Sequence, residues 1–111
     1  MRSFGLARAV PGKSFYFTSE SEVMTWSATV GPDGNLSDLK PFAHQGGEGV
    51  AADSEGRVYI ASGQIEVFNA AGLPVETIEV PERPIQLAFG GRDGRTLFIT
   101  ARSSLYSVRV R

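Results

Sequence analysis

The 111-residue sequence contains no cysteine, which excludes disulfide bonds, thiolate nucleophiles and zinc–thiolate sites. It also has no apolar run near the roughly 18 residues of a membrane-spanning helix, so we expect no membrane partner. The 11 basic and 12 acidic residues nearly balance, and lysine and arginine form no block. We therefore expect no nucleic-acid partner. The absence of cysteine also fits a cytoplasmic location, which is our expectation.

Two further patterns are absent. No serine lies in a G-x-S-x-G turn, and one histidine gives no basis for a Ser/His/Asp triad. No segment carries an amphipathic helix's apolar stripe of useful length. Instead, 13 glycines and six prolines separate short runs rich in Phe, Tyr, Val and Thr. Such runs favour pleated strands, and the sequence predicts an all-β fold.

Three segments of the chain repeat one pattern: a glycine turn, a basic or small polar residue, then large apolar residues around an aromatic one. The segments are Gly12–Thr18, Gly56–Ala61 and Gly94–Thr100, with Tyr16, Tyr59 and Phe98 at equivalent positions. These aromatics are 43 and 39 residues apart. A period of about 40–45 residues with four strands per repeat is typical of β-propeller blades. We interpret the repeated aromatics as core packing residues of the blades.

The repeats divide residues 1–111 into blade-like units at about 4–43, 48–80 and 84–111. Predicted strands cover residues 6–10, 14–18, 22–30 and 39–43 in the first unit; 50–52, 57–61, 64–69 and 75–80 in the second; and 85–89, 96–100 and 105–110 in the third. Alternation along residues 22–30 indicates a strand with one buried face.

The sequence therefore predicts a partial β-propeller of about three four-stranded antiparallel blades, the last lacking its outer strand. Because a closed ring needs about four to eight blades, three blades would leave two flanks exposed. The expected partner is a missing propeller half or a second copy of the chain, as a homodimer of half-propellers.

The second and third units resemble a known family in four stretches: GVAADSEGRVYIA at Gly49–Ala61, IEVF at Ile65–Phe68, LAFGG at Leu87–Gly91 and GRTLFIT at Gly94–Thr100. The family is that of senescence-marker protein, gluconolactonase and luciferin-regenerating enzyme, and the chain is similar to its carboxy-terminal half. Its members are six-bladed, calcium-dependent propellers that include lactone hydrolases. The resemblance implies that fold and that chemistry here.

The resemblance also implies a divalent-metal site, with Ca²⁺ as the expected ion in the complete fold. A family metal ligand, an Asp, falls on Glu48, which we predict to be a metal ligand or catalytic proton acceptor; the alternative is a solvated loop carboxylate. A family Asn ligand falls on Phe4, which cannot coordinate a metal. Because Ca²⁺ takes six to eight oxygen ligands, we expect no metal to bind this chain alone.

Four further side chains are predicted to contact a small-molecule lactone or sugar acid: His44, Arg83, Gln86 and Arg102. A planar guanidinium such as that of Arg83 suits a carboxylate; the alternative is an ion pair with Glu82 or Glu79. His44 can carry a proton, or can simply be an exposed loop residue. Asp53, in the sequence DSEG, is interpreted as a hairpin-turn residue rather than a calcium ligand.

The function that these features and the resemblance imply is metal-assisted hydrolysis of a sugar lactone or similar small ester. We expect the 111 residues alone to be inactive, because most of the implied site lies elsewhere. The alternative is a non-catalytic propeller module that binds a ligand or a partner.

Overall fold

The computed structural model describes residues 4–6, 14–19, 23–33, 35–44, 46–53, 55–91 and 94–110. These residues form eleven β-strands and no helix, so the predicted all-β class is confirmed. Accordingly, none of these segments is a helix long and apolar enough to cross a membrane. All strand pairings are antiparallel.

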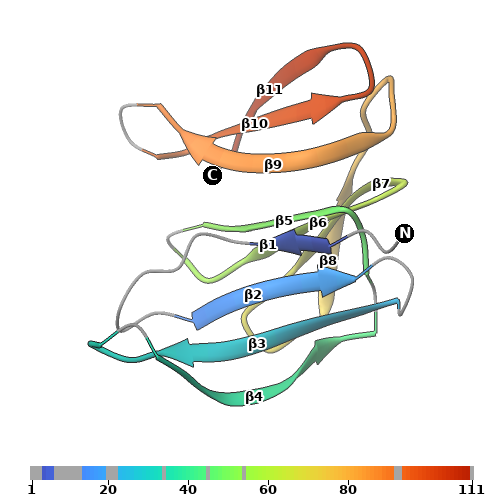
Figure 1. The fold of residues 1–111 in the computed structure, drawn as a ribbon. Coiled ribbons are helices and arrows are strands. Elements are labelled where there is room, and N and C mark those ends of the chain that lie inside the picture. The colour runs from blue at the N-terminus through green and yellow to red at the C-terminus, as the bar shows by residue number, and fades with distance from the viewer. Residues whose placement is uncertain are drawn as a thin grey trace.

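The strands form three sheets in chain order (Figure 1). The first sheet contains β1 (Phe4–Leu6), β2 (Ser14–Ser19), β3 (Met24–Val30) and β4 (Leu36–Ala43). The second contains β5 (Gly49–Ala52), β6 (Val58–Ser62), β7 (Gln64–Phe68) and β8 (Pro74–Ile78). The third contains β9 (Pro84–Gly90), β10 (Thr96–Ala101) and β11 (Leu105–Arg109), with β10 in the middle.

The observed strands differ from the predicted ones chiefly in the first sheet. The strand predicted at residues 6–10 is observed as β1 at Phe4–Leu6, and residues 7–10 lie outside the described residues. The outer strand β4 begins at Leu36 rather than at residue 39. Pro41 lies in this strand, at the edge of the sheet. A proline is tolerated at an edge because no further strand there requires its missing N–H as a hydrogen-bond donor.

Two apolar cores hold the sheets together, and β6 contributes to both. Val58 and Ile60 pack with Tyr16 of the first sheet, whereas Tyr59 and Ala61 pack with residues of the third sheet. All four β6 side chains are at most 2% exposed. Because successive residues of a strand point to opposite faces, this unbroken apolar run suits a middle layer. The second sheet accordingly lies between the other two (Figure 1).

The three repeated aromatics do not share one environment. Tyr16 is 7% exposed in the core between the first and second sheets, and Tyr59 is 2% exposed between the second and third. Phe98 is 38% exposed, on the face of β10 opposite to buried Leu97. The predicted packing is thus confirmed for the two tyrosines, and for Phe98 it stays a prediction. The reason is that no described sheet covers the outer face of the third sheet.

On strand β3, two polar side chains are buried more completely than the aromatic side chain between them. Thr25 and Ser27 are 0% and 6% exposed, whereas Trp26 is only half-buried. Trp26 pairs directly with Phe17 of β2, and the two rings stack with centroids 6.4 Å apart. The prediction of one buried face is therefore wrong, because Ala28 and Val30, on the Trp26 face, are also buried. Thr25 Oγ1 lies 2.8 Å from Thr18 Oγ1, and this hydrogen bond makes the burial of the Thr25 hydroxyl tolerable.

Candidate functional site

Glu48 lies in the connection from the first sheet to the second, within the sequence Gly46-Gly47-Glu48-Gly49. A Cβ atom at each glycine would overlap a backbone carbonyl oxygen: that of Ser19 for Gly46, of Ala61 for Gly47 and of Ile85 for Gly49. These carbonyls belong to or flank the first, second and third sheets in turn. The segment therefore passes close to the backbones of all three sheets, and only glycine fits on either side of Glu48.

Hydrogen bonds fix the same segment. The Glu48 N–H donates to the Ala61 carbonyl oxygen at 2.9 Å, and the Gly47 N–H donates to Thr18 Oγ1 at 2.9 Å. Thr18 Oγ1 also lies 2.8 Å from Thr25 Oγ1, and both threonines are fully buried. These bonds hold the Glu48 backbone against both neighbouring sheets, so the position of its carboxylate is set largely by the fold.

Arg83 reaches Glu48 from the third sheet. Arg83 directly precedes β9, whose start lies beside the start of β5, and its Nε lies 3.5 Å from Glu48 Oε2. The two side chains are 56% and 24% exposed. The sequence suggested Glu82 or Glu79 as the ion-pair partner of Arg83, and the structure places Glu48 there. A partly exposed pair of this kind contributes about 0–1 kcal/mol to stability.

Glu82, next to Arg83, is surrounded by hydrogen-bond donors. Its carboxylate accepts bonds from Ser104 Oγ at 2.7 Å, Ser103 Oγ at 2.9 Å, Tyr106 Oη at 3.0 Å and the Ser103 N–H at 3.2 Å. These bonds, that from Ser104 first, lower the pKa of Glu82 to about 2. The cluster ties the segment before β9 to the β10–β11 turn and so positions Arg83. This cluster was not predicted from the sequence, because Glu82 and the residues that donate to it are about 20 residues apart along the chain.

The Glu82 cluster predicts a specific pH dependence. Its pKa is about 2 in the folded chain and 4.5 ordinarily, so folding favours the carboxylate form. The resulting stabilisation is complete above the ordinary pKa and is lost as pH falls from 4.5 towards 2. We expect the Tm of the parent to fall more steeply over this range than that of Glu82→Gln, and to be the higher of the two at neutral pH. Parallel Tm curves in calorimetry would contradict the prediction.

The other predicted contact residues lie near this region but at separate points. His44 is exposed directly after β4, and Arg102 is exposed in the β10–β11 turn. Gln86 is exposed on β9, on the face opposite to buried Leu87. The structure thus brings Glu48 and Arg83 together as an ion pair, and it leaves His44, Gln86 and Arg102 accessible to solvent.

Asp53 occupies the opposite end of the second sheet and has the turn role predicted for it. Its Oδ1 accepts the N–H groups of Glu55 and Arg57, both at 2.9 Å. Its Oδ2 accepts Arg57 Nε at 2.7 Å and Tyr59 Oη at 3.0 Å. Burial, followed by the bond to Asp53, raises the pKa of Tyr59 to about 12, and the bond to Asp53 also raises the pKa of Arg57. Tyr59 therefore stays neutral and Arg57 stays charged, and both side chains serve the hairpin.

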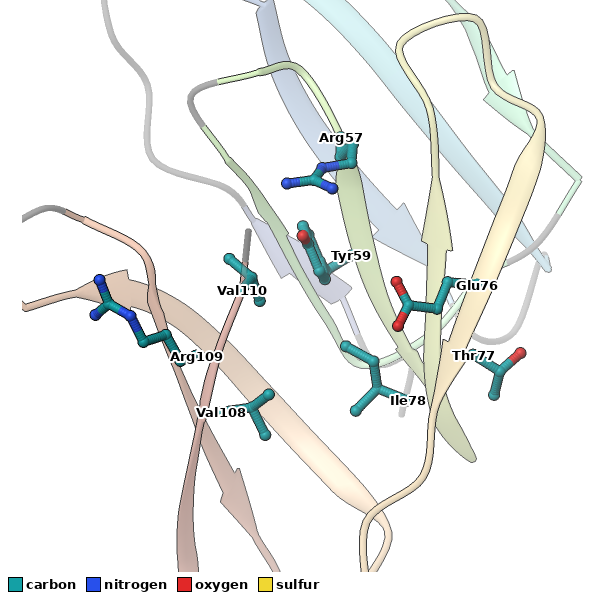
Figure 2. Close-up of a pocket in the computed structure, with 8 residues that line it drawn as sticks. All are labelled: Arg57, Tyr59, Glu76, Thr77, Ile78, Val108, Arg109 and Val110. Carbon is teal, nitrogen blue, oxygen red and sulfur yellow. The ribbon is translucent and has the colours of Figure 1, made fainter.

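A groove of about 620 Å³ opens beside this turn, between β8 and β11 (Figure 2). Its walls are Arg57, Tyr59, Glu76, Thr77, Ile78, Val108, Arg109 and Val110. Because β6 runs antiparallel to β5, Arg57 lies at the end of the sheet opposite to Glu48. The groove is therefore separate from the Glu48–Arg83 pair.

The side chains around Glu48 do not fit a divalent metal by themselves. No group of three or more His, Asp or Glu residues within the described ranges is placed to hold a cation. Glu48 supplies one carboxylate, and Arg83 already lies against it. Calcium requires six to eight oxygen ligands, so the described residues around Glu48 do not make a calcium site by themselves.

Comparison with known families identifies the chain. The SMP-30/Gluconolactonase/LRE-like region matches residues 4–103. The chain belongs to this family. A search of curated proteins gave no match to this SMP-30/gluconolactonase/LRE-like chain.

Solved structures show the same fold. A gluconolactonase from Xanthomonas campestris superposes on 97% of this SMP-30/gluconolactonase/LRE-like chain with a TM-score of 0.79 and 24% identity. The calcium-binding protein regucalcin from Agrobacterium tumefaciens covers 94% at a TM-score of 0.77 and 19% identity, and luciferin-regenerating enzyme covers 91% at 0.72 and 18%. The chain spans only 37–39% of the length of these three proteins.

Proposed function

We propose that this chain is the carboxy-terminal portion of a hydrolase that acts on a sugar lactone or similar small ester. Its three sheets are then three blades of a six-bladed propeller. Family membership and the likeness to a gluconolactonase support this proposal. Any divalent metal in the complete protein would take most of its ligands from outside these residues, and the chain alone is expected to be inactive.

The observation that carries the proposal is the Glu48–Arg83 pair. A carboxylate and a guanidinium from adjoining sheets lie 3.5 Å apart and open to solvent. Arg83 can donate hydrogen bonds to a lactone carbonyl oxygen, which becomes negative as water adds to the carbonyl carbon. Glu48 can accept the proton of that water and return it to the ring oxygen as the ring C–O bond breaks. The product is a hydroxy acid, whose carboxylate Arg83 also suits.

A second function, ligand binding without catalysis, is favoured by the same ion pair. The guanidinium of Arg83 now pairs with the carboxylate of Glu48. It can pair instead with the carboxylate of a sugar acid, and the sugar acid is then bound. No hydrolysis is needed for that role, and the ligand class is unchanged.

Two measurements separate these functions. Gluconate is expected to raise the Tm of the chain, and Arg83→Ala is expected to abolish that shift. Hydrolysis is tested in a chimera in which this chain replaces the matching part of the Xanthomonas gluconolactonase. We expect turnover of glucono-δ-lactone, lowered about 100-fold or more by Glu48→Gln. A folded chimera that binds gluconate but lacks turnover supports the binding module, and loss of both activities contradicts both functions.

A further inference from the structure

Four hydrogen bonds fill the acceptor positions of the Glu82 carboxylate. Its Oε1 accepts the Ser103 hydroxyl at 2.9 Å and the Ser103 N–H at 3.2 Å. Its Oε2 accepts the Ser104 hydroxyl at 2.7 Å and the Tyr106 hydroxyl at 3.0 Å. A carboxylate offers about four lone-pair positions, two on each oxygen. The Glu82 cluster therefore uses the full hydrogen-bonding capacity of this side chain.

This matters because Glu82 directly precedes Arg83 in the sequence. The pKa of Glu82 is lowered to about 2, so its carboxylate is charged at neutral pH. A charged carboxylate next to a guanidinium is a natural ion-pair partner for it. In the structure, however, Arg83 Nε lies 3.5 Å from Oε2 of Glu48, which precedes the second sheet. A competing carboxylate is thus present in the chain but is bound by other donors.

The backbone on the other side of Arg83 is also fixed. Pro84 is fully buried and pairs with Ala101 of β10. A residue that precedes proline is restricted to extended conformations, in which successive side chains point to opposite sides. The Glu82 side chain accordingly reaches the β10–β11 turn, and the Arg83 side chain reaches the second sheet.

We propose that the three hydroxyls of the Glu82 cluster determine which carboxylate Arg83 binds. Because they occupy Glu82, it does not compete for the guanidinium, and Arg83 stays available to Glu48 and to a carboxylate ligand in its place. The hydroxyls are positioning groups, since they act through Glu82 and Arg83. The inference rests on the proposed function for the class of ligand, a sugar acid.

The test removes the three side-chain donors and keeps the carboxylate. The triple variant combines Ser103→Ala, Ser104→Ala and Tyr106→Phe in the full chain. Three acceptor positions on Glu82 are then open to Arg83. If Arg83 pairs with Glu82 about nine-tenths of the time, the apparent Kd for gluconate rises about tenfold, because only the remaining fraction is competent to bind. Isothermal titration calorimetry with gluconate measures the change.

Adding Glu82→Gln to the triple variant separates competition from loosening of the segment. Glutamine is neutral and removes the competing charge, so we expect the Kd to return to within about threefold of the parent value. Loosening alone predicts no recovery, because Glu82→Gln weakens the remaining bonds further. Thr77→Val is the matched control: it removes a hydroxyl that donates to the Glu66 carboxylate at 3.1 Å in the second sheet. Its Kd should equal that of the parent.

A second measurement needs no ligand. The NMR resonance of the Arg83 Nε–H shifts when the carboxylate beside it is neutralised. We expect Glu48→Gln to cause the larger shift in the parent, and Glu82→Gln to cause the larger shift in the triple variant. If the triple variant does not fold, Ser104→Ala alone removes the shortest of the four bonds. It should change the Kd and the resonance in the same directions.

The outcomes are distinct. Weaker gluconate binding that Glu82→Gln restores, together with transfer of Arg83 to Glu82, supports the proposal. Unchanged binding, weaker binding without recovery, or an Arg83 resonance that still follows Glu48 in the triple variant overturns it. If the parent itself does not bind gluconate, the binding role under the proposed function fails. The Arg83 resonance then decides by itself whether the hydroxyls determine the partner of Arg83.

Discussion

Replacement of Gly47 by alanine is expected to destabilise the fold by at least about 3 kcal/mol. The added Cβ would overlap the Ala61 carbonyl oxygen, which is backbone and cannot rotate away as a side chain does. The same carbonyl accepts the Glu48 N–H, so a shift that relieves the overlap also breaks that bond. Chemical denaturation of Gly47→Ala against the parent measures the loss.

Gly63→Ala is the matched control. Gly63 has φ near +77°, but an added Cβ there meets no atom within 4 Å. Its cost is therefore the backbone strain of an L-residue in the left-handed region, about 1–2 kcal/mol. If Gly63→Ala costs as much as Gly47→Ala, crowding between the sheets is not the reason that Gly47 is required.

Removal of the Asp53 carboxylate is expected to cost about 3 kcal/mol. The side chain of Asp53 is only 5% exposed and accepts four hydrogen bonds from the turn and from β6. Asp53→Ala leaves two backbone N–H groups, the Arg57 guanidinium and the Tyr59 hydroxyl without this acceptor. Equilibrium unfolding of the variant measures the loss.

Asp53→Asn separates shape from charge in this cluster. The amide oxygen can still accept the N–H groups of Glu55 and Arg57, but the attraction to the Arg57 side chain is lost. We expect Asp53→Asn to be intermediate between the parent and Asp53→Ala. A second readout is the pKa of Tyr59, raised to about 12 in the parent, which should fall in both variants, since the carboxylate contributes to that rise. An unchanged tyrosine titration would show that burial alone is responsible.

The sequence by itself determined the kind of local structure. Glycine turns, alternation and β-branched or aromatic runs sufficed to predict ten of the strands to within a few residues, because these signals act between near neighbours. The turn role of Asp53 was predictable for the same reason, as its bonds reach at most six residues along the chain. The motifs quoted from Gly49 onwards pointed to the family that the comparison then showed.

Only the tertiary structure decided which of these residues meet. Glu48 and Arg83 are 35 residues apart in sequence, and their pairing depends on the contact between β5 and β9. Tyr59 and Phe98 occupy equivalent positions, but among the described residues only Tyr59 is covered by a neighbouring sheet. The glycines around Glu48 were visible in the sequence, but their necessity appears only when three backbones converge on them. Propensity is a property of a segment, whereas a site is made by distant segments brought within a few ångströms of each other.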